Sequence, residues 1–514
     1  MTIEKYSSIK DDSILNLSNN QVIMNDFRII KITKDISEIT LTSNGDTCKG
    51  TIIVKPRTTD LTINIENLKL NSMEHIAIDF RAGKENSYKN FIHFKGNNVI
   101  CSEQNIAICV GNNQTLEIYG EEDSTLKAIS GVNMPVIGSG KYSSGAGNII
   151  FSNKGSIMLE VGKSNNAETS MPWIGRNGSY ALGFCNEDKT KSSSIKILDH
   201  IKLKAIGEDG ENIKSISSEN TTGNGGAAIY LNDNDYLIKS SDANMCLIGG
   251  NGGRCIGEYS SGKCGDGGPA IKINGGIISI FAPASLKGGN GGSIEKDSLC
   301  ILAPGGNGGD GILVLGNEYS DDLKLLLTIG DDVEITAGNG GNSGYCMNDK
   351  GISGVNGGNG GNLINGGETS IELQLGNIKG IVGCGGIGGC NEPPCKDGEN
   401  GKDIIGEKII IKEALEEIND EEKREDNVLE EIAYKENIEE DILEEINNEE
   451  NTKENILEEV YNDVVKEDEK EEIYEILTDD ILSNKEEETG LEVYKKEKKP
   501  NFIIRFFRWL FGRS

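Results

Sequence analysis

One pentapeptide, Gly-Gly-Asn-Gly-Gly, recurs along the middle of the chain, at residues 249–253, 288–292, 305–309 and 357–361. The flanking sequence repeats as well, because residues 225–229 return as residues 267–271, 42 positions later. Repetition at a nearly fixed period is the signature of a solenoid or a propeller. Propeller blades usually carry aromatic motifs, and only 5% of this chain is aromatic, so the repeats favour a solenoid.

Short runs of alternating apolar and polar residues fill the first 410 positions, for example at residues 61–65, 76–80, 91–94 and 116–119. Most are rich in β-branched or aromatic residues and are bounded by Asn, Gly, Asp or Ser, as strands are. We therefore predict an all-β solenoid over 1–410, with stacked strands, inward Ile, Val and Leu, and Gly and Asn at the tight corners. A repeat period near 40 predicts about two coils per repeat.

These runs resemble a known group of folds. Residues 50–54, 61–65, 96–100 and 116–120 resemble the glycine-rich right-handed parallel β-helices of bacterial surface and carbohydrate-binding-type proteins, in the pectin-lyase-like superfamily. Residues 135–138, followed by 147–151, resemble that family's repeated Ile-Gly corner and alternating strand. The resemblance implies a right-handed parallel β-helix. Members of the family are usually exported, whereas the first residues here lack a basic segment followed by an apolar one, which predicts no secretory signal.

Charge and glycine divide the chain into three pieces. Residues 411–490 hold 33 acidic and 8 basic side chains, residues 491–514 hold 2 and 7, and 65 of the 67 glycines precede residue 411. We predict a solenoid over 1–410, an acidic linker over 411–494 and a basic-aromatic amphipathic helix over 495–514. The acidic balance disfavours a nucleic acid partner, because phosphate binding needs clustered Lys and Arg. The sequence contains no run of 18 apolar residues, so we predict no transmembrane helix.

The acidic segment carries a motif, Leu-Glu-Glu-Ile or a close variant, repeated every 14 residues. Its apolar positions are Leu415, Ile418, Leu429, Ile432, Leu443, Ile446, Leu457 and Val460. Fourteen residues are two heptads, which invites a coiled coil, but the alternate heptads place Glu425, Glu439 and Lys453 in the seam. Two interpretations remain open: a solvated linker with transient helices, or an array of docking motifs for the groove of a protein partner.

The last residues combine a run of lysines with large apolar side chains. We expect a membrane surface or a partner protein to contact Phe502, Ile503, Arg505, Phe506, Phe507, Arg508, Trp509, Leu510 and Phe511. A helix here would be about 20 Å long, too short to span a bilayer. The segment resembles the C-terminal membrane-targeting helices that follow linkers in some bacterial cell-division proteins. We expect either an anionic membrane surface or a groove on a protein as its partner.

Catalytic signals are scarce. The three histidines, His75, His93 and His200, have no metal-ligand spacing, and the sequence lacks the nucleophile-elbow, zinc-protease and phosphate-loop motifs. Lyases of the resembling superfamily use acidic metal ligands and a basic catalytic group, for which the loop candidates are Arg81, Lys84, Arg176, Glu208 and Arg254. No spacing selects a set among them. We therefore predict a protein that is not an enzyme, with no catalytic residues, no metal site and no cofactor.

One segment fits a calcium motif. Residues 305–313 match the nonapeptide of calcium β-rolls, with Asp310 at the ligand position. The other copies place Arg254, Ser293 or Asn362 there, and a β-roll needs neighbouring turns to share each ion. The segment is therefore interpreted as a glycine-rich corner.

Cysteines gather in the glycine-rich loops, at Cys255, Cys264, Cys346, Cys384, Cys390 and Cys395. Their spacing is looser than zinc sites prefer, and we predict thiols that are exposed and able to crosslink in an assembled coat. Cys101 and Cys109 lie in predicted strands and are expected to be small core side chains.

Together these features predict a non-catalytic structural scaffold or a coat or envelope-associated protein, tethered by its linker to a membrane surface or a partner. The expected location is the cytoplasmic face of a membrane, or a spore layer or envelope. The alternative is a carbohydrate-binding or polysaccharide-lyase-like β-helix protein. It would require an exposed aromatic row or a convergent acidic cluster, for which Trp173 and scattered Tyr are the candidates.

Overall fold

The computed structural model of the chain contains only β-structure among the residues that it describes. These residues are 2–4, 21–23, 28–32, 37–56, 59–82, 89–139, 147–162, 176–184, 193–214, 221–232, 235–256, 263–294, 303–315, 324–343, 345–348, 351–367, 369–389, 396–406 and 408–412. All lie within one compact unit, Met1–Glu417. Within these ranges no helix is long and apolar enough to cross a membrane.

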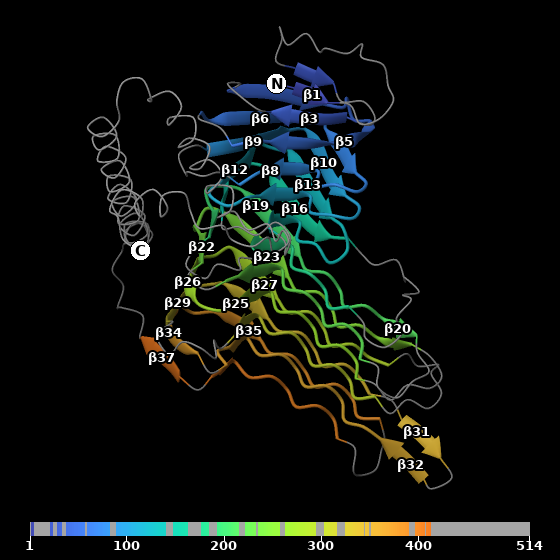
Figure 1. Cartoon of the computed structure of the whole chain (residues 1–514). Coiled ribbons are helices and arrows are strands. Elements are labelled where there is room, and N and C mark those ends of the chain that lie inside the picture. Colours follow the sequence, from blue (N-terminus) through green and yellow to red (C-terminus); the bar gives the residue numbers. More distant parts are fainter. Residues whose placement is uncertain are drawn as a thin grey trace, which may run out of the picture. The chain divides into compact units, whose positions relative to one another are not determined.

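The fold is a parallel β-solenoid in which each coil contributes one strand to each of three faces (Figure 1). The first face is a 12-stranded parallel sheet. Its strands are β2 (Gln21–Ile23), β4 (Glu38–Thr42), β6 (Leu61–Glu66), β9 (Lys89–Lys95), β12 (Thr115–Gly120), β15 (Asn148–Asn153), β18 (Ser194–Ile197), β22 (Tyr236–Lys239), β26 (Gly276–Ile280), β29 (Lys324–Ile329), β34 (Ser370–Leu375) and β37 (Lys408–Lys412).

The second and third faces join through one long strand, β5 (Thr47–Val54), which pairs with β7 at its start and with β8 at its end. The second face contains β7 (Lys69–Ser72), β10 (Asn97–Ser102), β13 (Thr125–Ser130), β16 (Ser156–Val161), β19 (Lys202–Ile206), β23 (Asn244–Ile248), β27 (Ala284–Lys287), β30 (Glu334–Thr336) and β35 (Lys379–Ile381). The third contains β1 (Thr2–Glu4), β3 (Arg28–Ile32), β8 (Ile78–Phe80), β11 (Ile108–Val110), β14 (Ile137–Ser139), β17 (Leu182–Phe184), β21 (Ile229–Leu231), β25 (Ile271–Ile273), β28 (Ile312–Val314), β33 (Ile364–Asn365) and β36 (Ile404–Ile405). At the N-terminal end, β1 runs antiparallel to β3.

The core is a set of columns of side chains that run from coil to coil. In β6 every second residue is buried, and its Ile63 pairs in register with Ile92, which pairs with Ile118. All three are fully buried. The alternation predicted from the sequence is therefore confirmed, because a strand with a period of two buries one side only.

The corners confirm the predicted role of Asn and Gly. The non-glycine residues with positive φ, among those described, are all Asn or Asp, as at Asn67 (φ 48°), Asp123 (φ 62°) and Asp332 (φ 58°). These three lie between a strand of the first face and a strand of the second. Short polar side chains tolerate this left-handed conformation, because they bond to the local backbone.

The prediction of two coils per sequence repeat is wrong, because each repeat of about 40 residues forms a single coil. Asn90 pairs with Leu116, 26 residues on, whereas Ile278 pairs with Leu327, 49 residues on. The longer coils carry additional residues between the second and third faces. Those residues form long arms that run away from the solenoid, seen as wavy segments ending near β20 (Ile213–Lys214), β31 (Tyr345–Asn348) and β32 (Gly351–Gly354) in Figure 1.

Candidate functional site

The arms of successive coils stack into a two-layered array, which we call the glycine bundle. The outgoing layer consists of residues 207–212, 249–254, 288–293, 337–343 and 382–388, and the returning layer consists of residues 176–180, 222–228, 264–270, 303–311, 355–363 and 396–403. Segment 305–309, part of the stretch interpreted above as a corner, is therefore an extended arm, and so is segment 357–361. The backbone hydrogen bonds of these arms repeat every three residues, which is the period of a polyproline II helix.

The glycine bundle is held together by backbone hydrogen bonds between arms. In a Gly-Gly-Asn triplet, one glycine donates to the next arm of its own layer, as Gly252 N–H does to Asn290 O at 2.8 Å. A second glycine donates across to the other layer, as Gly250 N–H does to Gly226 O at 2.8 Å. These contacts between arms therefore satisfy backbone groups of the extended arms.

Close approach explains why these positions are glycine. A Cβ atom placed on Gly252 would lie 1.9 Å from Gly265 O, and one on Gly250 would lie 1.9 Å from Glu208 O. A side chain on Gly252 would push the two layers apart, and one on Gly250 would push apart neighbouring arms of the outgoing layer. The glycine content thus reflects packing of backbone against backbone, as in collagen, where only glycine fits the crowded axis.

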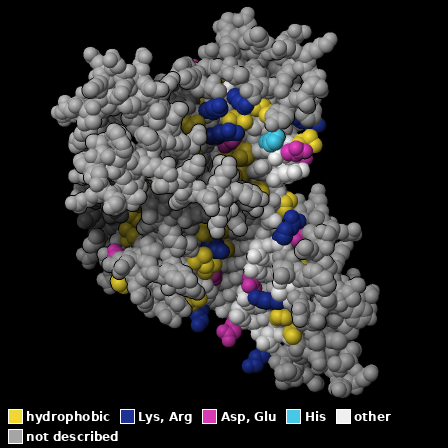
Figure 2. All heavy atoms as spheres, in the orientation of Figure 1, with side chains coloured by type: hydrophobic (Ala, Val, Ile, Leu, Met, Phe, Trp, Pro, Cys, Tyr) yellow, Lys and Arg dark blue, Asp and Glu magenta, His cyan; other side chains and the backbone are white. Residues whose placement is uncertain are grey.

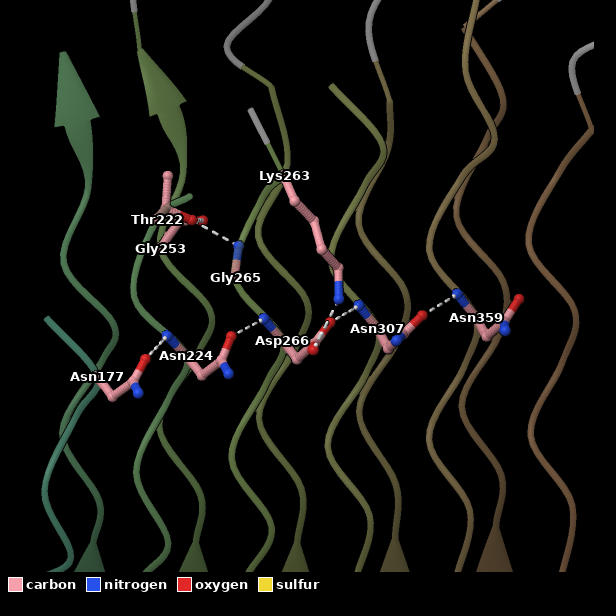
Figure 3. A network of polar contacts seen from close by, with 9 residues as sticks. All are labelled: Asn177, Thr222, Asn224, Gly253, Lys263, Gly265, Asp266, Asn307 and Asn359. Carbon is pink, nitrogen blue, oxygen red and sulfur yellow. Dashed lines mark hydrogen bonds and ion pairs between the residues drawn. The ribbon is translucent and has the colours of Figure 1, made fainter. Parts of the chain in front are cut away.

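Where the third position of a triplet is Asn, Asp or Ser, its side chain bonds to the next coil, as in the series drawn in Figure 3. In the returning layer, each side-chain oxygen accepts the backbone N–H of the corresponding residue one coil later, at 2.7–3.0 Å; the series is Asn177, Asn224, Asp266, Asn307 and Asn359. A second series in the outgoing layer runs through Asp209, Asn251, Asn290, Asn339 and the N–H of Cys384. We call these series the asparagine ladders.

Asp310, the residue at the ligand position of the calcium motif, is part of this network. One of its carboxylate oxygens accepts the backbone and side-chain N–H groups of Asn362 at 2.7 and 2.9 Å, and the other accepts Asn365 Nδ2 at 2.9 Å. Burial raises the pKa of the Asp310 carboxyl. In the described part of the chain, no group of three or more His, Cys, Asp and Glu side chains has metal-site geometry.

Glu208 is a buried carboxyl, 5% exposed, at the start of an outgoing arm. Its Oε2 accepts the backbone N–H groups of Asn133 at 3.0 Å and Ser179 at 2.9 Å. Burial raises the pKa of Glu208, and these two hydrogen bonds oppose the shift. The carboxylate therefore joins two neighbouring segments of backbone.

The candidates for a lyase-like site have separate partners. Arg81 pairs with Asp79 at 3.2 Å, Arg176 pairs with Glu211 at 3.2 Å, and the Arg254 N–H donates to Asn212 Oδ1 at 2.7 Å. Lys84 lies outside the described residues. Described side chains of both charge signs are interspersed on the face shown in Figure 2.

The cysteine prediction is wrong for two of the loop thiols. Cys255 and Cys264 are buried, at 3% and 1% exposure, whereas Cys384 is exposed. Cys109 is buried as predicted, but Cys101 is only half-buried, at an outward position of β10. Cys346 lies in β31, with no described side-chain environment, and Cys390 and Cys395 lie outside the described residues.

An aromatic cluster on the outer side of the first face was not predicted. The rings of His93 and Tyr119 stack at 4.9 Å, and Phe91 meets Tyr119 edge-on at 6.4 Å. His93 Nδ1 lies 3.0 Å from Asn64 Oδ1. Aligning the two strands in the sequence could have predicted this contact, because His93 and Tyr119 occupy paired positions of β9 and β12. Burial and the nearby Glu117 and Glu38 raise the pKa of Tyr119.

The remaining predicted site residues lie outside the described part of the chain. These are Trp173, the linker positions Leu415, Ile418, Leu429, Ile432, Leu443, Ile446, Leu457 and Val460, and the C-terminal positions Phe502, Ile503, Arg505, Phe506, Phe507, Arg508, Trp509, Leu510 and Phe511. They stay predictions from the sequence.

No family model, curated protein sequence or solved structure matches this chain. Arguments about function therefore proceed from its own residues and geometry.

Proposed function

We propose that the protein is a non-catalytic structural scaffold, in which the solenoid and its glycine bundle form one rigid body. The observation that carries the proposal is the hydrogen-bond network of the glycine bundle. Its glycine N–H groups bond to neighbouring arms, and the side chains of the asparagine ladders bond to the backbone of the next coil. Such a network stiffens a surface, whereas catalysis requires polar groups that converge on a substrate.

A tether completes the proposal. The acidic segment 411–494 would connect the scaffold to the segment 495–514, which would bind an anionic membrane surface or a protein groove, with the repeated Leu and Ile positions as docking motifs for a partner. The proposed location is the cytoplasmic face of a membrane, or a spore layer or envelope. No nucleic acid partner is proposed, because the chain has a net charge of −32.

The test compares the location of a tagged full-length protein with that of a variant truncated after Lys499. Tethering predicts that the full-length protein concentrates at a membrane or envelope layer and that the truncated one disperses. A variant carrying Arg505→Lys and Arg508→Lys keeps the charge and serves as the matched control. Identical distributions of the full-length and truncated proteins would contradict the tether.

We also propose kinship with the right-handed parallel β-helices of the pectin-lyase-like superfamily. The support is the three-strand coil with Asn and Gly at its corners. Left-handed coils would exclude this kinship, because the helices of that superfamily are right-handed, as crossovers between parallel strands nearly always are.

A second candidate function is carbohydrate binding, and the aromatic cluster is the observation that favours it. Phe91, His93 and Tyr119 lie next to each other on the outer side of the first face, with Asn64 as a polar neighbour. Aromatic rings on an outer surface, beside polar groups that fix orientation, suit a sugar polymer.

A glycan array probed with the full-length protein tests this candidate. Binding that is lost in Tyr119→Ala but kept in Tyr230→Ala would support it, because Tyr230 lies in β21 of the third face, where it stacks on Tyr180. Release of unsaturated uronates by the wild-type protein would instead indicate a lyase. If the protein neither binds glycans nor releases uronates, the carbohydrate candidate is rejected and the scaffold proposal is kept.

A further inference from the structure

Cys255 and Cys264 face each other at the outer end of one coil of the glycine bundle. Cys255 begins β24 (Cys255–Ile256), which follows the outgoing arm, and Cys264 begins the returning arm. Their Sγ atoms are 3.2 Å apart. Both side chains are buried, and they pack with Ala303 and Ile294 in a small apolar cluster that is separate from the solenoid core.

The backbone on both sides fixes this geometry. Cys255 pairs with Ile213 of β20 in the preceding coil and bridges to Ile294 in the following one. The Cys264 N–H donates to Pro304 O at 3.2 Å. Next to the pair, Gly265 N–H donates to Gly253 O at 3.1 Å, which joins the two arms of the same coil (both glycines are labelled in Figure 3).

We propose that Cys255 and Cys264 form an intramolecular disulfide that covalently joins the outgoing and returning arms of this coil. A disulfide has an S–S length of about 2.03–2.05 Å, so the two sulfurs must approach by roughly 1.2 Å. The preceding coil places Ile213 and Thr222 at the corresponding arm ends, so that coil cannot form an equivalent bond.

The chemistry needs a small oxidant that reaches a buried pair, and a peroxide is the appropriate class. The Cys264 thiolate attacks one peroxide oxygen, the O–O bond breaks, and the departing hydroxide takes up a proton to become water. The resulting sulfenic acid is attacked by Cys255 sulfur. The S–O bond breaks, and hydroxide leaves with the thiol proton as a second water. Two thiols and one hydrogen peroxide thus give one disulfide and two waters.

The local electrostatics agree with Cys264 as the first nucleophile. The hydrogen bond with Cys255 lowers the pKa of Cys264, and the positive charge of Lys263 acts in the same direction, while burial opposes them. A larger thiolate fraction increases reactivity toward oxidants. Lys263 is itself held in place by an ion pair with Asp266 at 3.0 Å.

The sequence allows a direct test on the full-length wild-type protein. Trypsin cuts after Arg254, Lys263 and Lys272, so it releases Cys255 and Cys264 on separate peptides, 255–263 and 264–272. The protein is reduced, freed of reductant, exposed to hydrogen peroxide, unfolded in iodoacetamide and digested without reductant. We expect the two peptides joined, with a mass two hydrogens below their sum, and separated after reduction.

Two variants and an internal reference sharpen the experiment. Cys246→Ser should leave the yield of the joined peptides unchanged, because Cys246 lies on β23 at a half-buried position. In Cys255→Ser, Cys264 should stop at the sulfenic acid, which dimedone labels. The joined pair should form about tenfold faster than any disulfide of the exposed Cys384. Recovery of both peptides only as separate alkylated species, or joined to Cys384 at a similar rate, would overturn the proposal.

Discussion

At the scale of single residues, the asparagine ladders show how one side chain can replace a missing backbone partner. The N–H of Asn339 donates to the side-chain oxygen of Asn290, 3.0 Å away. Asn, Asp and Ser all supply such an oxygen at these positions, for example Ser293 Oγ for the Asn342 N–H. The ladder therefore selects an acceptor atom, not a particular residue.

This predicts different effects for two substitutions at position 290. Asn290→Ala removes the acceptor and should destabilise the Asn339 hydrogen bond by about 1 kcal/mol, which speeds exchange of that amide hydrogen about fivefold. Asn290→Asp keeps an oxygen between uncharged neighbours, Asn251 and Asn339, and should change exchange little. Hydrogen exchange measured by mass spectrometry resolves the two cases. Equal acceleration in both variants would contradict the claim that the ladder requires only an acceptor oxygen at this position.

Glu208 gives a pH dependence with a definite sign. Because burial raises its folded-state pKa above the ordinary value of 4.5, folding favours the protonated form. The associated stability is present at low pH and is lost as the pH rises from the unfolded-state pKa through the folded-state pKa.

Glu208→Gln keeps an acceptor oxygen without the ionisation. The free energy of unfolding of the variant, minus that of the wild-type protein, should therefore grow as the pH rises from 4 to 7. Urea denaturation at both pH values measures the difference, and comparing the two proteins cancels the titration of the many other carboxylates. A difference that shrinks with rising pH would mean that the ionised form is favoured in the folded protein.

At the scale of elements, the strands were predictable and the glycine arms were not. Residues 61–65 alternate, so their apolar side chains indicate both a strand and its buried side. An arm such as 249–253 carries no apolar pattern, because its packing uses backbone atoms alone. The Gly-Gly-Asn triplets repeat every three residues, and this period could have predicted the arms. Aligning Asn251 with Asn290 would also have predicted the asparagine ladder.

The buried side of β9 can be tested by paired substitutions. Phe94 is fully buried, and its ring occupies the space where a Cβ of Gly120 would lie, at 2.3 Å. Phe94→Ala should lower the free energy of unfolding by about 3–5 kcal/mol. Phe91→Ala, on the outer side of the same strand, should cost about 1 kcal/mol. Urea unfolding followed by circular dichroism distinguishes them, and equal costs would contradict the register of this strand.

At the scale of the whole molecule, the aromatic-basic segment 495–514 is expected to bind anionic lipid. Lys495, Lys496, Lys498 and Lys499, with three arginines, each add attraction of about 1 kcal/mol near such a surface. The acidic segment repels the same surface, but screening over about 8 Å limits this effect to nearby charges.

Flotation with anionic liposomes should therefore carry the full-length protein upward, and a Phe506→Glu, Trp509→Glu double variant should stay at the bottom. Neutral liposomes should recover less of the wild-type protein. If both proteins float equally, or neither does, a protein groove replaces the membrane as the partner of this segment.

The coil-by-coil register of the solenoid has a consequence for how such a chain can change in size. Apart from β1 and the antiparallel pair β31 and β32, the described strands pair with their equivalents one coil before and after, and the glycine arms bond to arms of the same coil and of the adjacent coils. A tandem duplication of about one coil would meet matching surfaces above and below it, because stacked repeats contact only their neighbours. Gene duplication can thus lengthen the molecule in whole coils, without requiring a new core.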